Sequence, residues 1–191
     1  MFAQQPIWGN VIPVSAQMTG DDLLRLPDDG SKNELFEGVL IKDTMTTAGH
    51  GIICHRLGGM LFLYAMQYGF TNTILQNALF DLTPVGVQRR TVMAPDISIM
   101  RGKIAPATNI TMDIPLIAVE VVSPSQTLAE LAIKAQFYHR VGVEEVWLID
   151  PDTRVIEMWT AHGQTTLNAT QSLTSALLPS FMLDIKYLLD G

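Results

Sequence analysis

The chain has 191 residues, of which 48% are hydrophobic and only 16% are charged. Soluble domains carry roughly 25% charged residues, so this composition indicates a compact body with a sizeable core and excludes a disordered chain. The single cysteine, Cys54, excludes an internal disulfide and a zinc site built from several cysteines. The formal net charge of −7 argues against a broadly basic nucleic-acid surface, because phosphates are contacted largely by Lys and Arg.

The organisation of the chain predicts one domain over residues 1–191, with residues 1–16 as an extended lead-in that contains Pro6, Gly9 and Pro13. We see neither the core of a secretory signal nor an apolar span of about 18 residues, so a soluble, cytoplasmic protein without a membrane segment is expected.

The sequence predicts both helices and strands along the chain. Thr19 with Asp22 three residues on predicts a short capped helix that ends before Pro27. Residues 34–43 predict a hairpin or a strand broken at Gly38. The further predictions are an amphipathic helix at 50–68, strands at 71–82, 89–100 and 114–122, a helix at 128–141, and strands at 144–150 and 154–160. This order favours an α/β (α+β) fold with a mixed central sheet flanked by helices.

Glu120 lies inside the apolar run "IPLIAVEVV". Successive side chains of a strand alternate faces, and here both faces are apolar, which is typical of a central strand covered on both sides. A carboxylate in that position must pair with a cation, accept hydrogen bonds or lie at the end of the strand. A purely structural ion pair is one interpretation, and a functional site is the other.

Asp96, in "VMAPDISIM", is ambiguous when considered alone. It shares one face of the predicted strand with Ser98 and Met100, so a solvent-facing position on a half-exposed strand would explain it. Pro95 cannot donate to a sheet ladder and indicates a strand start or an edge strand.

Lys134 lies at the margin of the apolar face of the predicted helix 128–141, one turn after Glu130. One interpretation is an exposed Glu130–Lys134 pair, which contributes about 0.3–0.5 kcal/mol. Together with Asp96 and Glu120, however, the lysine completes a set suited to metal-assisted phosphodiester cleavage. Two carboxylates can hold a hard divalent cation, and a lysine can offset charge developing on the phosphate.

The sequence also resembles a known family. The segments "NELFEGVLI", His50, "APDISIM", "IAVEVVSPSQT", "KAQFYHRVGVEEVWLIDP" and "LPSFMLDI" follow the order and spacing of the Uma-type bacterial proteins. This family is assigned to the PD-(D/E)XK restriction-endonuclease-like superfamily, and the resemblance runs from about Thr19 to the C-terminus. It implies a restriction-endonuclease-like fold.

The resemblance also implies site residues. Pro95-Asp96 matches the PD motif, which makes Asp96 a metal ligand, and Glu120 matches the second acid, with the Val121 carbonyl nearby. The superfamily's lysine normally lies two residues after that acid, where this chain has Val122. A helix lysine replaces it in Uma-type proteins, and Lys134 matches that position.

Two further residues are implied by the same resemblance. Glu34 matches an early acid that would complete the metal shell. His50 matches a recurrent histidine at the start of the long helix and is a further candidate, although a capping or solvent-facing role would also explain it. The implied catalytic set is Asp96, Glu120 and Lys134.

Two hypotheses for the function remain open. The first is a Mg²⁺- or Mn²⁺-dependent endonuclease acting on nucleic acid, with DNA favoured, and a homodimer because the superfamily often cuts both strands. The second is a nuclease-fold binding or regulatory module with little or no cleavage, which the acidic charge favours. The basic residues nearest to Asp96 in sequence, which could meet phosphates or lie in ordinary solvated turns, are Arg89, Arg90, Arg101 and Lys103.

Overall fold

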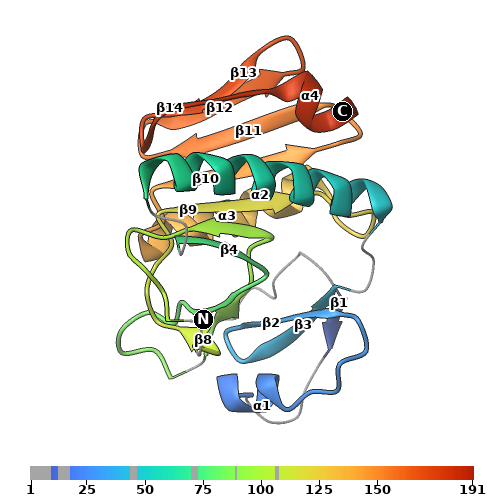
Figure 1. The fold of residues 1–191 in the computed structure, drawn as a ribbon. Helices are drawn as coiled ribbons and strands as arrows, with labels where there is room; N and C mark the ends of the chain where they lie inside the picture. The colour runs from blue at the N-terminus through green and yellow to red at the C-terminus, as the bar shows by residue number, and fades with distance from the viewer. Residues whose placement is uncertain (1–9, 13–17, 44–46, 70–72, 89, 106–107) are drawn as a thin grey trace.

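The computed structural model describes residues 10–12, 18–43, 47–69, 73–88, 90–105 and 108–191 (Figure 1). A mixed six-stranded sheet forms its centre, in the strand order β12-β11-β10-β9-β7-β4. Its strands are β4 (Ile74–Gln76), β7 (Ile97–Ile99), β9 (Ile117–Val121), β10 (Glu145–Asp150), β11 (Val155–Thr160) and β12 (Gly163–Asn168). β9 and β10 run parallel and the other neighbours are antiparallel, so the predicted mixed central sheet is confirmed.

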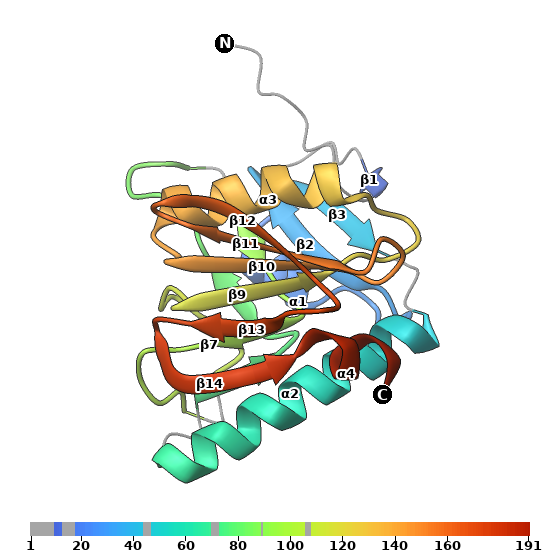
Figure 2. The same ribbon diagram turned by 90° about the horizontal axis from the view of Figure 1, so that it is seen from above.

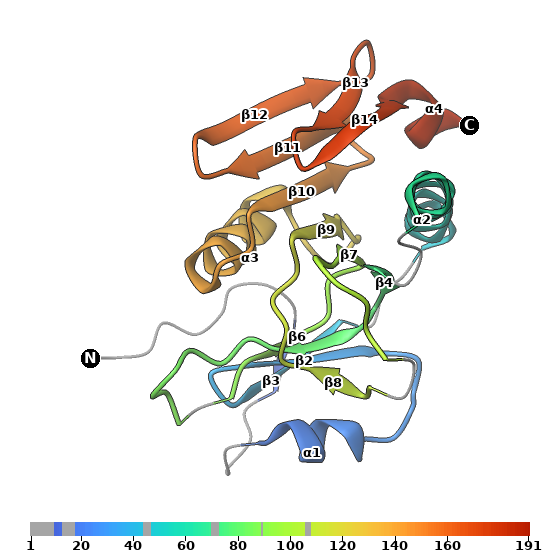
Figure 3. The same cartoon turned by 60° about the vertical axis from the view of Figure 1, so that its left-hand side comes forward.

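The central strand β9 is buried on both faces, as its sequence predicts. Ile117, Val119 and Val121 pack on one side with helix α2 (Ala48–Tyr68). Ala118 packs on the other side with helix α3 (Leu128–Val141), and Figure 3 shows the two helices on opposite sides of β9 and β10. Glu120 therefore points into a closed layer between the sheet and α3.

Both covering helices have clear start and stop signals. Thr47 caps α2, and Thr127 forms a capping box with Glu130 at the start of α3. Each helix ends at a glycine with positive φ, Gly69 and Gly142. The predicted bounds of α3 are confirmed.

A second sheet lies beside the first, in the strand order β1-β3-β2-β6-β5-β8. Its strands are β1 (Asn10–Ile12), β2 (Lys32–Phe36), β3 (Val39–Asp43), β5 (Leu79–Asp81), β6 (Val92–Met93) and β8 (Ile110–Thr111). β2 and β3 form the predicted hairpin, and both residues of its turn, Glu37 and Gly38, have positive φ, as a type I′ turn requires. The short helix α1 (Gly20–Leu24) has the predicted capping box of Thr19 and Asp22.

Two strand predictions need correction. The segments 71–82 and 89–100 are each divided between the two sheets, the first into β4 and β5 and the second into β6 and β7. Pro95 lies at the second break, where it has no N–H to give to a ladder. Positive φ at Asn77 marks the first break, and its amide donates to the Asp96 carbonyl at 3.2 Å. Asp96 consequently lies at the junction between the sheets.

The C-terminal part adds the hairpin of β13 (Ser172–Ser175) and β14 (Leu178–Asp184) and the helix α4 (Ile185–Asp190). Figure 2 shows these elements on the side of the central sheet that carries α2, where Leu173, Phe181 and Leu188 join the same core. In the described part of the chain, none of the helices has the length and apolar character that crossing a membrane requires.

Candidate active site

Asp96 is buried and its carboxylate is held by three groups. Its Oδ1 accepts from Lys32 Nζ at 2.7 Å, and its Oδ2 accepts from the Val121 amide nitrogen at 2.8 Å. His50 Nε2 lies 3.2 Å from Oδ2. Only 4% of Asp96 is exposed, and its neighbours Ser98 and Met100 are buried as well. The interpretation of Asp96 as a solvent-facing residue is therefore wrong, because the second sheet covers this end of β7.

Glu120 receives donors on both carboxylate oxygens. Tyr138 and Lys134, both from α3, lie 2.7 Å from its Oε1. Lys32 Nζ lies 3.4 Å from its Oε2. The sequence prediction that a buried Glu120 must be paired is confirmed, and its three partners come from two elements, α3 and β2.

Lys134 is buried and pairs with Glu34 as well as with Glu120. Its Nζ lies 2.9 Å from each carboxylate oxygen of Glu34. The same Glu34 accepts from the Ala94 amide at 2.7 Å. The alternative of an exposed pair with Glu130 is wrong, since Lys134 is 1% exposed and the Glu130 side chain bonds Thr127.

Lys32 is the residue of this cluster that the sequence did not single out. Its segment, "DDGSKN", has the composition of a turn, where a lysine is normally solvated. In the structure Lys32 begins β2 and shares a face with Glu34 and Phe36, because side chains two apart on a strand point the same way. This face turns toward α3, where Phe36 packs edge-on against Phe137. The pattern Lys-x-Glu-x-Phe was the sequence signal that could have placed Lys32 on the same strand face as Glu34.

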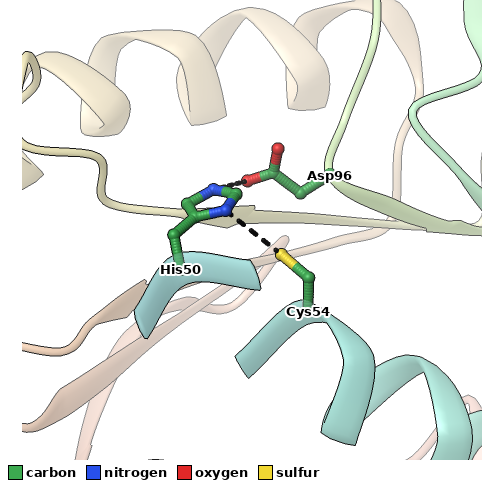
Figure 4. Close-up of side chains that lie close together, drawn as sticks. All are labelled: His50, Cys54 and Asp96. Atoms are coloured by element: carbon green, nitrogen blue, oxygen red, sulfur yellow. Dashed lines mark hydrogen bonds and ion pairs between the residues drawn. The ribbon is translucent and has the colours of Figure 1, made fainter. Parts of the chain in front are cut away.

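His50 lies in the first turn of α2, where its imidazole links Asp96 to Cys54 (Figure 4). Its Nδ1 is 3.7 Å from the Cys54 Sγ, and its amide donates to the Thr47 hydroxyl. The side chain is 12% exposed, so the solvent-facing interpretation is wrong. The ligand atoms of His50, Cys54 and Asp96 lie within 4.8 Å of one another. One ring nitrogen of His50 therefore lies close enough to both other ligand atoms for this trio to hold a metal ion.

The network shifts the ionisation of its members. Burial alone would raise the pKa of Asp96, yet the charges of Lys32 and His50 hold it well below its ordinary value. Burial alone would lower the pKa of Lys32, yet Asp96 and Glu120 hold it well above its ordinary value. Burial would likewise lower the pKa of His50, but Asp96 and Cys54 raise it to about 10. At neutral pH, Asp96 is therefore ionised and both bases are protonated.

Glu120 and Tyr138 are affected mainly by burial. Burial raises the pKa of Glu120; Lys134 and Lys32 oppose this rise, while the nearby carboxylates of Asp96 and Glu34 reinforce it. Burial and the adjacent Glu120 raise the pKa of Tyr138 well above its ordinary value, so the phenol stays neutral and acts as a donor.

A pocket of about 900 Å³ opens onto one side of this cluster. Lys32, His50 and Asp96 line it, together with Ser123 and residues after α1 such as Leu26. Lys134, in contrast, is not one of the residues that line this pocket in the described part of the chain. The cluster thus has one side turned to the pocket and another closed off against α3.

The donor set fits a divalent cation. Asp96 Oδ1 and Glu120 Oε2 both approach Lys32 Nζ, so the two carboxylates already converge on one positive charge. Here the Lys32 ammonium stands in for a metal cation. Oxygen donors of this kind suit Mg²⁺ and Mn²⁺. The contact recorded for Val121 is its amide nitrogen on Asp96; the predicted role of its carbonyl stays a prediction.

The basic residues near Asp96 are partly engaged elsewhere. Arg90 pairs with Asp81 at 3.2 Å, and Arg101 pairs with Glu144. Arg89 lies outside the described residues. A role of these residues, or of the exposed Lys103, in phosphate binding stays a prediction.

Tyr138→Phe is expected to lower the free energy of unfolding by about 1.5–3 kcal/mol, since it deletes a buried donor to a charged acceptor. Urea denaturation would measure the loss. Tyr187→Phe is the matched control, because Tyr187 is 51% exposed. Equal stability of the two variants would mean that the phenol does not support Glu120.

Comparison with known proteins identifies the fold and the family of the chain. The chain resembles a crystal structure described as a "putative nuclease belonging to DUF820" from Anabaena variabilis, with a TM-score of 0.72 and 20% identity, over 90% of this chain and 97% of that chain. The molecule therefore has a nuclease-like α+β fold. The model of the Uma2 family, described as "Putative restriction endonuclease", matches residues 21–186, and the chain belongs to this family. The resemblance noted in the sequence is thereby confirmed, while a search of curated proteins found no match.

Proposed function

We propose that the protein is an endonuclease that uses Mg²⁺ or Mn²⁺ to hydrolyse phosphodiester bonds of nucleic acid, with DNA as the favoured substrate. The observation that carries this proposal is the convergence of Asp96 and Glu120 on the Lys32 ammonium, beside a pocket that Asp96 and Lys32 line. Membership of a family described as restriction endonucleases supports the same class of reaction.

Asp96 and Glu120 would hold the divalent cation, with Glu34 as the nearest further acid. When bound, such a cation stabilises charge on the phosphate and lowers the pKa of a water molecule. The Val121 amide orients Asp96, and Tyr138 orients Glu120.

Lys134 and His50 differ in their access to substrate. Lys134 pairs with Glu34 and Glu120 on the closed side of the cluster, so we assign it the positioning of these carboxylates. His50 lines the pocket and is protonated, which suits a contact with a phosphate oxygen.

The test is a cleavage assay on supercoiled plasmid, linear duplex DNA, single-stranded DNA and RNA. Each substrate is incubated with Mg²⁺, Mn²⁺ or EDTA. We expect nicking of the plasmid, which has no ends and so reports endonuclease activity, with Mg²⁺ or Mn²⁺ and none with EDTA. Cleavage of no substrate under any metal condition would contradict the proposal.

One observation favours the second candidate, a binding or regulatory module without cleavage. Lys32 already pairs with both carboxylates, so the folded state has a counter-ion for them without a metal. Isothermal titration with Mg²⁺ and Mn²⁺ separates the two functions. A chain that binds nucleic acid but neither metal would be such a module.

A further inference from the structure

Lys32 occupies the position between the carboxylate of Asp96, which lines the pocket, and that of Glu120. Its Nζ is the donor shared by Asp96 Oδ1 and Glu120 Oε2, at 2.7 and 3.4 Å. The Lys32 side chain is 21% exposed and lines the pocket, whereas that of Lys134 is 1% exposed. Of these two buried lysines, Lys32 is the one with open space beside it.

The charges of the cluster bear on what can bind there. Asp96, Glu120 and Glu34 carry three formal negative charges against the two positive charges of Lys32 and Lys134. His50, protonated and paired with Asp96, adds a further positive charge, so without Lys32 the remainder has a formal charge of −1 and still attracts a cation. Two cations cannot share the same pair of oxygens, since they repel each other strongly at a few ångströms in a poorly solvated site.

We propose that Lys32 is a displaceable internal counter-ion that leaves Asp96 and Glu120 when a divalent cation binds and then contacts a phosphate oxygen of the substrate in the pocket. This inference rests on the proposed function. The flexible four-carbon stem of lysine allows its ammonium to move by several ångströms while Lys32 stays anchored in β2. The same charge therefore serves the apo protein as a structural partner and the loaded protein as a phosphate ligand.

The first test compares Mn²⁺ binding by isothermal titration in the wild type and in Lys32→Met. Removing the competing charge is expected to tighten Mn²⁺ binding by about tenfold or more. Lys42→Met is the matched control, because Lys42 lies on the paired strand β3 and binds Asp29 instead. Equal affinities of the wild type and Lys32→Met would overturn the proposal and leave the metal site intact. Absence of Mn²⁺ binding in both would overturn the proposed function as well.

The second test uses the wild type alone and does not depend on the folding of a variant. An amine-acylating reagent labels lysines, and mass spectrometry follows the peptide that contains Lys32, with Lys42 as the internal reference. We expect Ca²⁺ or Mg²⁺ to accelerate labelling of Lys32 severalfold and to leave Lys42 unchanged. An unchanged rate at Lys32 under saturating metal would mean that its ammonium does not leave the carboxylates.

The third test addresses the phosphate contact. Binding of a DNA oligonucleotide in Ca²⁺ is measured by fluorescence anisotropy over a range of salt concentrations. Lys32→Met is expected to weaken binding and to reduce the slope of log affinity against log salt by about one, the loss of one phosphate contact. Lys42→Met should keep the wild-type slope. A wild-type slope in Lys32→Met would overturn the assignment of Lys32 as a phosphate ligand.

Discussion

Lys134→Met is expected to lower the free energy of unfolding by about 3–5 kcal/mol, the range seen when one partner of a buried ion pair is removed. The substitution leaves Glu34 and Glu120 buried without the ammonium that lies 2.9 and 2.7 Å from their oxygens. Methionine keeps most of the volume, so the loss reports charge rather than a cavity. Chemical denaturation followed by circular dichroism measures the effect.

Two companion variants make that measurement decisive. Lys103→Met removes an exposed lysine and is expected to change stability by less than about 0.5 kcal/mol. Combining Lys134→Met with Glu34→Gln should cost less than the sum of the single changes, since the double variant removes both charges of one pair. Strict additivity, or a Lys134→Met variant as stable as Lys103→Met, would show that the pair carries no such energy.

Asp96→Asn is expected to reduce metal-dependent cleavage by about a thousandfold or more, equivalent to roughly 4 kcal/mol of transition-state stabilisation. The amide has nearly the shape of the carboxylate but lacks the negative charge that holds a cation. Plasmid nicking rates measure the loss, and Mn²⁺ titration should show a parallel loss of binding.

The control for that experiment is Asp152→Asn, an exposed aspartate in the turn between β10 and β11. Circular dichroism must show that both variants are folded before their rates are compared. Cleavage by Asp96→Asn at the rate of Asp152→Asn would remove Asp96 from the reaction.

The carboxylates of the site could be predicted from the sequence for a simple physical reason. Glu120 interrupts an apolar strand that has no solvent side, so its burial and its need for partners follow from strand periodicity. Asp96 was ambiguous alone. A strand with one polar face has the same sequence pattern whether solvent or a second sheet covers that face. The layer above Asp96 comes from β2, about 60 residues earlier, and local pattern does not reveal it.

The two lysines also differ in whether the sequence predicted them as site residues. Lys134 was selected through its combination with Asp96 and Glu120 and through the family resemblance, since its own helix pattern also suits an exposed ion pair with Glu130. Lys32 was missed because it stands where a turn becomes a strand, and turn composition dominates the local signal. The hydroxyl of Tyr138 was also missed. The residue belongs to the apolar face of α3, and packing of that face was enough to explain its position.

The division of residues 71–82 and 89–100 between two sheets could not be predicted from hydrophobicity. Each segment is apolar enough for one continuous strand, and a strand that changes sheets keeps the same character. Pro95 was the one local sign of the break, and it was interpreted as a strand start or an edge. That break is what directs Asp96 toward Glu120.

The tight turn at Glu37 and Gly38 bears on how the whole site assembles. A two-residue hairpin fixes which residues of β2 lie opposite those of β3, and through this it fixes the face on which Lys32 and Glu34 project. A shift of one residue would present Asn33 and Leu35 to α3 and turn both charged side chains away. The partners of Lys32 and Glu34 lie 60 to 100 residues further along the chain. A two-residue loop thus sets the alignment of a cluster drawn from distant segments of the chain.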